Sequence, residues 1–445
     1  MFRFRSSGVG MVLAVAMGVA IYHHGIRVGA LAERAQPAAQ AQPTTPAGCL
    51  QAATDFLNER MKAARATGPL TSERYQAITR ERAKFAADCA AQFSIATTPP
   101  ADLVALAQIY MLAELPDRAG EAMARALAAA GLGAPERAKV LVAAVRLVMA
   151  QPVSEARNAR AESYVAELDG LPDSVVMEKI GAHGSLNSYY RADDIDAGII
   201  AHSTRLIELG RKLTPEQRKA AGSTLIMAYK NLAEAWAGQE RTAEAVDLLR
   251  RAPKELAGVD RVDEIIAPTL ERYLLVGTAA APIEAPRWLN AAAGTTRFDP
   301  KGSVSLIEFT AHWCGPCRES YPGIIRLSKL FAGKGFNVTM ATQLYGYFGS
   351  QRNLSPAGEL AAIEKYFPEH GITFPVAVAD MPQAQTVDGK TVRAVDVNEA
   401  NYKVGGIPQI MIVDKRGIIR LIMVGYDDKN EERLVALIAR LLVES

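Results

Sequence analysis

Two cysteines spaced three positions apart are the residues of this chain best placed to do chemistry. Cys314 and Cys317 belong to residues 313–317, which read Trp-Cys-Gly-Pro-Cys. The apolar run 304–310 before them is typical of a β-strand, and the pattern after them predicts a helix over Arg318–Phe331. Both sulfurs then lie on one side of the first helical turn, where unpaired N–H groups and the helix dipole stabilise a thiolate. A thiolate is the attacking species in disulfide exchange, so we expect Cys314 to be the nucleophile and Cys317 the resolving thiol.

Three other interpretations of this cysteine pair are weaker. Half of a zinc site would need a second ligand pair, but the sequence holds no other Cys-x-x-Cys and no close Cys/His cluster. A purely structural bridge would close so short a ring that it would remove little chain entropy. Chance is disfavoured by the strand–turn–helix setting. The sequence therefore predicts a redox centre that needs no metal and no other cofactor.

Two separate motifs resemble one protein family. Residues 309–318, Phe-Thr-Ala-His-Trp-Cys-Gly-Pro-Cys-Arg, resemble the active site of thioredoxin-fold proteins. The following Glu-Ser-Tyr-Pro at 319–322 favours the membrane-associated TlpA/ResA-like branch of that family. Residues 402–417 resemble the family's cis-proline strand and the hairpin after it. The resemblance implies an α/β thioredoxin-like domain over residues 286–445, with a central mixed sheet flanked by helices.

Pro408 is the residue whose interpretation depends most on this resemblance. It opens the apolar run Ile410–Val413, and proline is tolerated at the first residue of a strand. The residues alone favour a trans bond, because only about one X–Pro bond in twenty is cis in folded proteins. The resemblance implies instead a cis Ile407–Pro408 bond beside the sulfur of Cys314, with the main chain of Ile407 open to a substrate segment. It assigns substrate contacts to Trp313, Gly315, Pro316, Ile407 and Pro408.

Glu308 lies six residues before Cys314, where thioredoxins carry a buried aspartate. A carboxyl group inside an apolar strand is desolvated, which raises its pKa and suits it to proton transfer. We expect Glu308 to take the proton of Cys317 as that thiol attacks a mixed disulfide; the alternative is a surface acid on a partly solvated strand. Thr310 and Gln409 replace a tryptophan and a threonine that are common in the family, and both are expected to alter the surface that a partner meets.

The dithiol predicts an enzyme of disulfide exchange that acts on protein disulfides. Gly-Pro between the cysteines resembles the reducing members of the family, and a peroxidase is excluded because Ala311 stands where the peroxiredoxin motif needs threonine. The alternatives are a disulfide oxidase or isomerase of the same fold, and a helical scaffold with a vestigial redox domain. A reductase must be re-reduced, and the chain has no Gly-rich dinucleotide fingerprint. We therefore expect a membrane thiol electron donor.

The N-terminal residues have the pattern of a targeting segment. Two arginines among the first five residues precede an apolar stretch, Val9–Tyr22, which is as long as a signal-peptide core and short for a membrane span. Residues 1–32 are therefore predicted to be a signal peptide or, if uncut, a membrane anchor through residues 8–22. Residues 33–48 are a flexible linker rich in Ala, Gln and Pro. Under either interpretation, the protein is expected to be exported to the periplasm or cell envelope.

The other two cysteines also favour an exported protein. Helices are predicted over Leu50–Thr67 and Thr71–Phe93, with Gly68-Pro69 as the break between them. In an antiparallel hairpin that turns near residue 69, Cys49 and Cys89 fall side by side. A structural disulfide between them is expected only in an oxidising compartment. The alternative is two unpaired buried cysteines.

Residues 49–275 have a helical pattern throughout and predict an all-α region. Two segments, 103–126 and 229–252, resemble the tetratricopeptide pattern, although their separation is not a multiple of its usual period. A degenerate repeat array would offer a concave face to a protein partner, and an ordinary helical bundle with no binding role stays open. Residues 276–285, rich in alanine and proline, are the predicted linker to the thioredoxin-like domain.

Length, charge and one insertion complete these expectations. A chain of 445 residues predicts two or three domains. Its 50 basic and 48 acidic residues nearly balance, which gives no nucleic-acid footprint. Within the thioredoxin-like domain, strands are predicted over 337–342 and 373–379 and a helix over 356–367. The insertion 380–401, with a hairpin signal at 386–392, and the aromatic loop 345–348 are expected to shape the docking surface.

Overall fold

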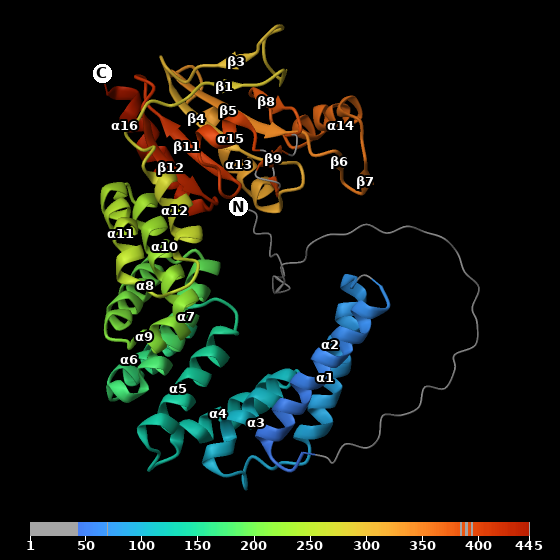
Figure 1. The fold of residues 1–445 in the computed structure, drawn as a ribbon, viewed down its shortest axis with the longest axis vertical. Coiled ribbons are helices and arrows are strands. Elements are labelled where there is room, and N and C mark those ends of the chain that lie inside the picture. The colour runs from blue at the N-terminus through green and yellow to red at the C-terminus, as the bar shows by residue number, and fades with distance from the viewer. Residues whose placement is uncertain (1–42, 69, 383–384, 388–389, 393–394, 445) are drawn as a thin grey trace, which may run out of the picture. The chain divides into compact units, whose positions relative to one another are not determined.

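The computed structural model describes residues 43–68, 70–382, 385–387, 390–392 and 395–444, and Figure 1 shows their fold. The predicted signal peptide or anchor, 1–32, and most of the linker 33–48 lie outside the described residues. The chain divides into two compact units between Leu186 and Asn187. The linker predicted at 276–285 thus lies inside the second unit, together with the helices before it. Among the described residues, no helix combines the length and the apolar character needed to span a membrane.

The described part of the first unit is helical, as predicted. Its helices are α1 (Pro46–Ala66), α2 (Ser72–Ala90), α3 (Pro100–Leu112), α4 (Pro116–Ala128), α5 (Ala134–Met149), α6 (Glu155–Asp169), the 3₁₀ turn η1 (Asp173–Val175) and α7 (Val176–Ala192), which continues into the second unit. Proline in the first turn and hydroxyl caps set several helix starts; Thr45, Thr71 and Ser154 each accept a backbone N–H three residues ahead. Neighbours in sequence pack as pairs, α1 with α2, α3 with α4 and α5 with α6. The predicted repeat character of these pairs stays a prediction.

The first pair of helices carries a disulfide at its open end. Cys49 near the start of α1 and Cys89 near the end of α2 are both buried, their Cα atoms are 6.0 Å apart, and a disulfide joins them. Farther along the pair, the rings of Phe56 and Phe85 stack with their centroids 5.3 Å apart. The two helices are thus held together by a covalent link and by a ring contact one to two turns away.

The second unit begins with a group of helices that we call the helical segment, residues 196–273. It comprises α8 (Asp196–Arg211), α9 (Pro215–Ala220), α10 (Gly222–Gly238), α11 (Thr242–Glu255) and α12 (Val262–Tyr273). α10 is the centre of this group, because it packs on α8, α11 and α12. Small residues allow the close approach: a side chain at Gly198 of α8 would collide with the ring of Tyr190.

The rest of the second unit is a sheet domain, residues 277–444. Its strands are β1 (Ile283–Glu284), β2 (Arg287–Leu289), β3 (Arg297–Phe298), β4 (Val304–Phe309), β5 (Phe336–Gln343), β6 (Tyr347–Phe348), β7 (Gln351–Arg352), β8 (Val376–Ala379), β9 (Gln385–Val387), β10 (Lys390–Val392), β11 (Gln409–Val413) and β12 (Ile419–Val424). Its helices are α13 (Gly315–Leu330), α14 (Pro356–Glu369), α15 (Val397–Asn401) and α16 (Asp428–Val443). The main sheet has the order β12-β11-β4-β5-β8-β2, in which β4, β5 and β8 run parallel and the other pairs are antiparallel. This is the mixed sheet that the family resemblance implies.

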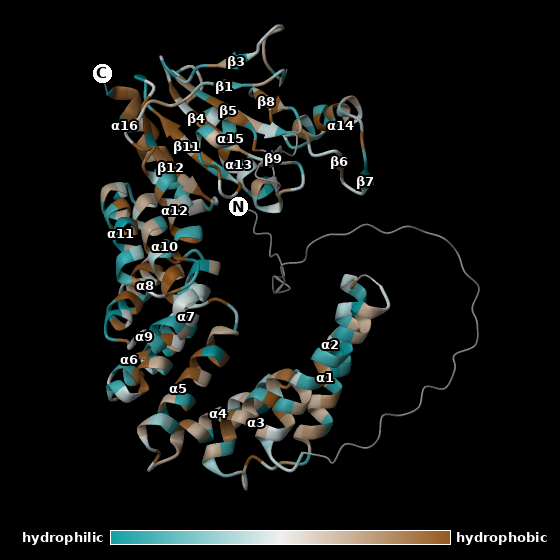
Figure 2. Cartoon of the chain, in the orientation of Figure 1, coloured by the Kyte–Doolittle hydropathy of each residue, from teal (hydrophilic) through white to brown (hydrophobic). Residues whose placement is uncertain are grey.

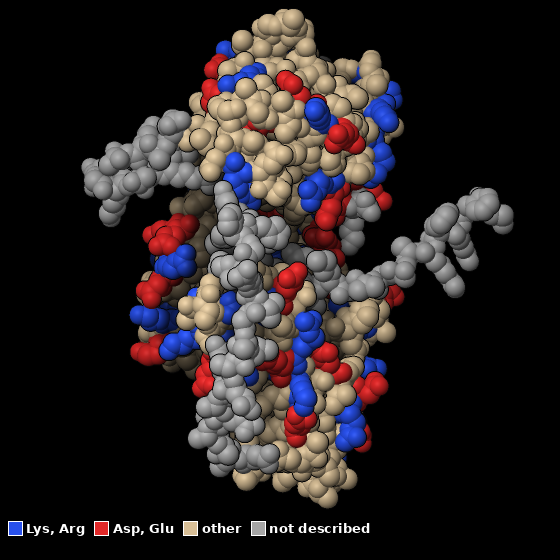
Figure 3. Space-filling model, turned by 90° about the vertical axis from the view of Figure 1, so that its right-hand side faces the viewer, with Lys and Arg blue, Asp and Glu red and all other residues tan. Residues whose placement is uncertain are grey.

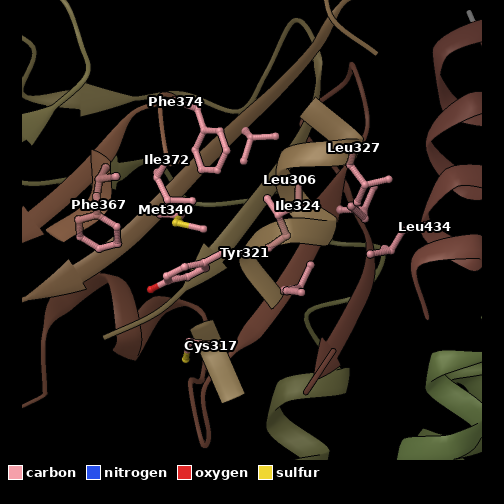
Figure 4. Close-up of a cluster of buried hydrophobic side chains, with 14 of the residues drawn as sticks. Leu306, Cys317, Tyr321, Ile324, Leu327, Met340, Phe367, Ile372, Phe374 and Leu434 are labelled. Atoms are coloured by element: carbon pink, nitrogen blue, oxygen red, sulfur yellow. The ribbon is translucent and has the colours of Figure 1, made fainter. Parts of the chain in front are cut away.

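One face of the sheet carries the main hydrophobic core. The crossovers β4–α13–β5 and β5–α14–β8 both join parallel neighbours in the same direction, which places α13 and α14 on the same face. Side chains of α13, α14 and α16 form a single buried cluster with the strands, and Figure 4 shows part of it around Tyr321 and Met340. β4 is buried along its whole length, and Figure 2 shows how hydrophobic the adjacent β11 and β12 are. β4 therefore lies in the interior, with both of its faces covered.

Local patterns predicted most elements of the sheet domain, but not its first strands. β5 and α14 match the predicted ranges closely, and the hairpin signal at 386–392 is confirmed by the antiparallel pair β9 and β10. β8 begins later than predicted, at Val376, directly after Pro375, which has no N–H for a sheet hydrogen bond. β1, β2 and β3 lie between residues 283 and 298 and were not predicted, because two or three residues give no measurable alternation.

Charged side chains of both signs are scattered over the face that Figure 3 shows. In Figure 3 basic and acidic residues are interspersed over the visible face, with no extended area of a single sign. The near balance of 50 basic and 48 acidic residues is therefore also a local balance on this face. Long-range electrostatics there favour neither a polyanion nor a polycation.

Removing the Cys49–Cys89 bridge should weaken the first unit without touching the second. The bridge closes a loop with a sequence separation of 40, for which chain entropy gives about 4 kcal/mol as an upper value. We expect Cys49→Ala/Cys89→Ala to lower the free energy of unfolding by about 2 to 4 kcal/mol in urea titrations. The protein with Cys49 and Cys89 and the protein without them should both also carry Cys314→Ser/Cys317→Ser, so that a reductant can act only on the Cys49–Cys89 bridge. An equal effect of dithiothreitol on the proteins with and without Cys49 and Cys89 would contradict this expectation.

Candidate active site

The two cysteines of the motif occupy different positions at the start of α13. Cys314 is the N-cap of the helix, and its sulfur accepts a hydrogen bond of 3.2 Å from the backbone N–H of Cys317. The pair forms a disulfide with Cα atoms 5.2 Å apart. Cys314 keeps 4% of its surface exposed and Cys317 none. Once the pair is reduced, only Cys314 can meet a partner, and the helix terminus favours its thiolate.

The loop before β11 lies against this sulfur. The Ile407–Pro408 peptide bond is cis, as the resemblance implies, and the carbonyl oxygen of Ile407 is 3.7 Å from Sγ of Cys314. The carbonyl of Pro408 accepts the N–H of Gly425 at 2.9 Å, which ties the loop to the end of β12. Because β11 pairs with β4, with Gln409 opposite Phe309, the loop and the motif emerge at the same edge of the sheet.

Glu308 is fully buried in β4, so the alternative of a surface acid is wrong. Burial raises the pKa of its carboxyl from 4.5 to about 8, and a hydrogen bond with Ser320 opposes part of this rise. Oγ of Ser320 is 2.9 Å from Oε1 of Glu308 and 2.7 Å from the carbonyl oxygen of Cys317. A hydroxyl has one proton, so it can donate to only one of these two oxygens. If Ser320 donates to Cys317, Glu308 must itself be protonated to complete the chain of hydrogen bonds, which agrees with its raised pKa.

Two substitutions relative to the family were expected to alter the surface, and this expectation is wrong. Thr310 is 2% exposed and Gln409 is fully buried. Oγ1 of Thr310 is 2.9 Å from the hydroxyl of Tyr321, below the motif helix, and Nε2 of Gln409 donates to the carbonyl of Tyr402 at 2.9 Å. Both residues therefore support the site from inside. Alternation along a strand cannot reveal this, because β4 and β11 are covered on both faces.

Trp313 and the aromatic loop 345–348 form an aromatic cluster next to the motif. Trp313 is 46% exposed, and its ring meets Tyr345 edge-on with the centroids 5.5 Å apart. His312 is buried among Tyr345, Tyr347 and Phe348. Burial lowers the pKa of His312 to about 4, and the nearby charge of Arg352 adds to this, so the imidazole is neutral at physiological pH. Trp313 is thus the exposed ring of an otherwise fixed cluster.

The base of the aromatic loop is fixed by Glu359, a residue that the sequence patterns did not single out. Its two carboxyl oxygens accept the backbone N–H groups of Tyr345 and Gly346 at 2.8 and 2.7 Å, and the side chain is fully buried. Oε1 lies 3.6 Å from Nε2 of His312. Glu359 therefore joins α14, the aromatic loop and the residue two positions before Cys314.

A second unpredicted contact reaches the cis-proline loop from the helical segment. Arg272 of α12 is 4% exposed, and its Nε donates to the carbonyl of Lys403 at 3.3 Å. A side chain on Gly405 would collide with the Arg272 guanidinium where it now lies, so the glycine makes room for this approach. The one available signal was the Gly405-Gly406 pair, since glycine in such a position often marks a close contact.

The comparisons with known proteins agree with this geometry. No family model matches the chain. It is 26% identical over 133 residues to the thioredoxin-like protein YneN of Bacillus subtilis, a match that covers 30% of this chain and 63% of that protein. It is 22% identical over 134 residues to the thiol-disulfide oxidoreductase ResA of Geobacillus kaustophilus, covering 30% of this chain and 61% of that protein. The chain thus spans less than two thirds of the length of either relative.

Two solved structures are similar over a somewhat larger share of the chain. The crystal structure of thioredoxin-like superfamily protein SPOA0173 is 25% identical with a TM-score of 0.29, covering 38% of this chain and 97% of that one. A thiol:disulfide interchange protein from Bacteroides sp. is 15% identical with a TM-score of 0.27, covering 37% and 90%. The sequence relatives and the two motifs name the same family. The sheet domain is a thioredoxin-fold domain of the ResA/TlpA type.

The thioredoxin-fold domain brings the predicted site residues to one edge of its sheet. Cys314 and Cys317 lie beside Ile407 and Pro408, and Glu308 lies on the strand that leads into the motif. Pro316, Ile407 and Pro408 line a common cavity, Gly315 is the first residue of α13, and Trp313 belongs to the aromatic cluster. The structure adds Ser320, Glu359 and Arg272 to the residues that hold this arrangement.

The raised pKa of Glu308 should make the protein less stable as the pH rises. Between pH 4.5 and about 8 the unfolded state has lost the Glu308 proton while the folded state keeps it, so the free energy of unfolding falls with pH, by about 4 kcal/mol at pH 8. Glu308→Gln should remove this dependence and raise stability at pH 8. Urea titrations of the oxidised protein between pH 5 and 8 measure it. The exposed Glu319→Gln makes the same charge change on α13 and should leave the slope intact; equal slopes in wild type and Glu308→Gln would contradict the assignment.

Proposed function

We propose that the chain is an exported thiol–disulfide oxidoreductase that reduces protein disulfides. The observation that carries this proposal is the Cys314–Cys317 pair, with one sulfur at a helix N-terminus beside the Ile407 carbonyl and the other buried behind it. An accessible nucleophile with a shielded resolving thiol is the arrangement that disulfide exchange needs. The curated relatives, one of them named a thiol-disulfide oxidoreductase, support the same reaction class.

The reaction proceeds by two thiol–disulfide exchanges, which together transfer two electrons from the dithiol to the partner disulfide. The Cys314 thiolate attacks one sulfur of a partner disulfide, forms a mixed disulfide and releases the other partner sulfur as a thiolate. Cys317 then loses its proton to Glu308 and attacks Sγ of Cys314. The Cys314–Cys317 disulfide forms, and the second partner sulfur leaves as a thiolate. The partner is reduced by two electrons and the domain is oxidised by two.

Glu308 suits the second exchange because its pKa, about 8, lies close to that of a thiol. An ordinary carboxylate would be a much weaker base toward a thiol. Ser320 contacts both the carboxyl of Glu308 and the backbone of Cys317, so the hydrogen bond can move with the proton. The proposed roles are therefore nucleophile for Cys314, resolving thiol for Cys317 and general base for Glu308.

Export is supported by two independent features. A disulfide at Cys49–Cys89, away from the redox pair, is stable in an oxidising compartment. The predicted signal peptide or anchor leads to the same place, the periplasm or cell envelope. A reductase there must receive electrons, and a membrane thiol donor remains our proposal for that role. A protein partner on the helices of the first unit likewise stays a prediction.

The reduction potential of the Cys314–Cys317 pair should lie near that of thioredoxin, about −270 mV. It is measured on the full chain by equilibration in defined redox buffers, alkylation, and mass spectrometry of the peptide that contains both cysteines. This readout separates the pair from Cys49–Cys89. A value of about −120 mV would indicate an oxidase instead of a reductase. If the pair shows no reversible two-electron couple, the protein is not an enzyme of this class and the scaffold alternative holds.

Single cysteine variants separate an enzyme from a scaffold. Cys317→Ser should accumulate mixed disulfides with partner proteins, because the resolving thiol is missing. Cys314→Ser should form no mixed disulfides with partner proteins. Its turnover of an insulin-type protein disulfide should fall by at least about 1,000-fold, because the nucleophile is missing. Non-reducing gels and a turnover assay measure both. Equal trapping by the two variants would contradict the assignment of Cys314 as nucleophile.

Glu308→Gln should slow the second exchange and spare the first. General base catalysis contributes on the order of 100-fold or more, so we expect a loss of that size in release of the second partner thiol. In the wild type this rate should rise with pH up to about 8, as Glu308 becomes a carboxylate, and the variant should lack that rise. Rapid-mixing experiments with a preformed mixed disulfide on Cys314 measure it. An unchanged pH profile in the variant would remove Glu308 from the mechanism.

A further inference from the structure

The helical segment is fixed to the thioredoxin-fold domain close to the exchange site, within the second unit. Nε of Arg272 in α12 donates to the carbonyl of Lys403 at 3.3 Å, and the side chain of Lys403 forms an ion pair with Glu271 at 3.5 Å. Arg433 of α16 forms an ion pair with Asp196 at the start of α8. α10 packs on β12, as Figure 1 shows. Several independent contacts therefore fix this group of helices beside the cis-proline loop.

Between these elements lies a partly open cavity of about 340 Å³, all of whose lining residues belong to the second unit. This volume falls at the small end of the range for ligand sites, about 300 to 1,000 Å³. The thioredoxin-fold side of the cavity includes Pro316, Ile407 and Pro408. The carbonyl of Ile407 is 3.7 Å from Sγ of Cys314, so the cavity begins next to the reacting sulfur.

The two sides of the cavity differ in chemistry. The side formed by the thioredoxin-fold domain is apolar where Met423 and Val424 lie beside the prolines, and polar where Asp427, Asn430 and Arg433 line it. The side formed by the helical segment and the end of α7 is polar and carries both signs of charge, with Arg191, Asn231 and Glu234. The Arg191 guanidinium bonds the carboxylate of Glu234 at 2.8 Å and remains 45% exposed. Hydrogen-bond donors and acceptors thus lie next to each other on this side of the cavity, and we call Arg191, Asn231 and Glu234 together the polar wall.

This wall is rigid before any partner arrives. Asn231 donates to the side chain of Asn187 at 2.6 Å, and Asn187 donates to Ser203 at 2.6 Å. The carboxylate of Glu234 is bonded by Lys230 as well as by Arg191. Polar groups that are held in place lose little entropy when a ligand binds, so a prearranged wall favours binding.

We propose that this wall binds an extended polypeptide segment next to the substrate cysteine, and that the helical segment thereby selects protein disulfides over small ones. The inference rests on the proposed function and names its substrate class. An extended main chain presents N–H and C=O groups in alternation, which fits a wall of mixed donors and acceptors beside an apolar surface. A small anionic disulfide such as glutathione disulfide would favour a site of positive charge alone. Ile407, which lines the cavity, is in contact with Sγ of Cys314, so a partner segment that reaches this sulfur can extend along the cavity.

Gly238, at the end of α10 and at the edge of the cavity, allows a direct test. The nearest atom to a Cβ added there is Nη1 of Arg433 at 3.9 Å, so a side chain can begin at this position without a clash, and Gly238 lines the cavity. Two substrates are compared in the full chain: a pair of ten-residue peptides joined by a disulfide, and glutathione disulfide. Gly238→Trp should lower kcat/KM for the peptide disulfide relative to kcat/KM for glutathione disulfide at least tenfold. The loss should come mainly from a higher KM for the peptide disulfide. Met227→Trp adds the same ring at an exposed position of α10 and is the matched control.

The outcomes separate this inference from the proposed function. If Gly238→Trp keeps the wild-type ratio and the wild-type reduction potential, the polar side of the cavity does not bind the peptide. The proposed oxidoreductase function would then still stand. If the variant does not fold, Arg191→Gln, whose side chain is already 45% exposed, should lower the same ratio several-fold, and no change there would likewise overturn the wall. A wild type that reduces neither substrate would overturn the proposed function itself, and with it the inference.

Discussion

The pairing of β4 with β11 is the interaction on which the rest of the site depends. β4 carries Glu308 and ends at the cysteine motif, while β11 begins directly after the cis-proline loop. Their antiparallel register sets Gln409 opposite Phe309, so two residues 100 positions apart in sequence meet at one edge of the sheet. A shift of one residue would turn every side chain of β11 to the other face and move the Ile407 carbonyl away from Cys314. Burial of both strands on both faces makes such a shift costly, which keeps the site in place.

The interior position of β4 also explains why a carboxyl group there behaves as a weak acid. Burial removes Glu308 from water, and within the described structure its only hydrogen-bond partner is Ser320, because Oε2 has none. A neutral carboxyl tolerates this environment, whereas an ion would be strongly disfavoured. If Glu308 is the base that we propose, the site gives up some stability near neutral pH for a group whose proton affinity is close to that of a thiol. Functional sites commonly break a folding rule in this way, here the rule that buried polar atoms are hydrogen-bonded.

Sequence patterns predicted the parts of the site that depend on neighbours in the chain. The strand–motif–helix order, the two cysteines and the hairpin after β8 can be read from short-range spacing, and the cis bond at Pro408 follows from family resemblance alone. The contacts made across the fold could not be predicted. Arg272 meets Lys403 over a sequence separation of 131, and the inward positions of Thr310 and Gln409 require the sheet order to be known. Neither periodicity nor composition contains that information, because both describe one segment at a time.

The position of the helical segment shows that the site extends beyond the thioredoxin fold. Gly405 has no side chain where the Arg272 guanidinium packs, and the loop that follows leads within two residues to Ile407. The geometry of the exchange site therefore depends on α12 as well as on β11, so the helical segment and the thioredoxin-fold domain form one functional body. A helical wall beside the reacting sulfur adds a surface that is independent of the dithiol chemistry. If this wall binds partners as we propose, partner choice can vary through α8, α10 and α12 while the cysteines and Glu308 stay unchanged, because the residues of the wall are not those that react.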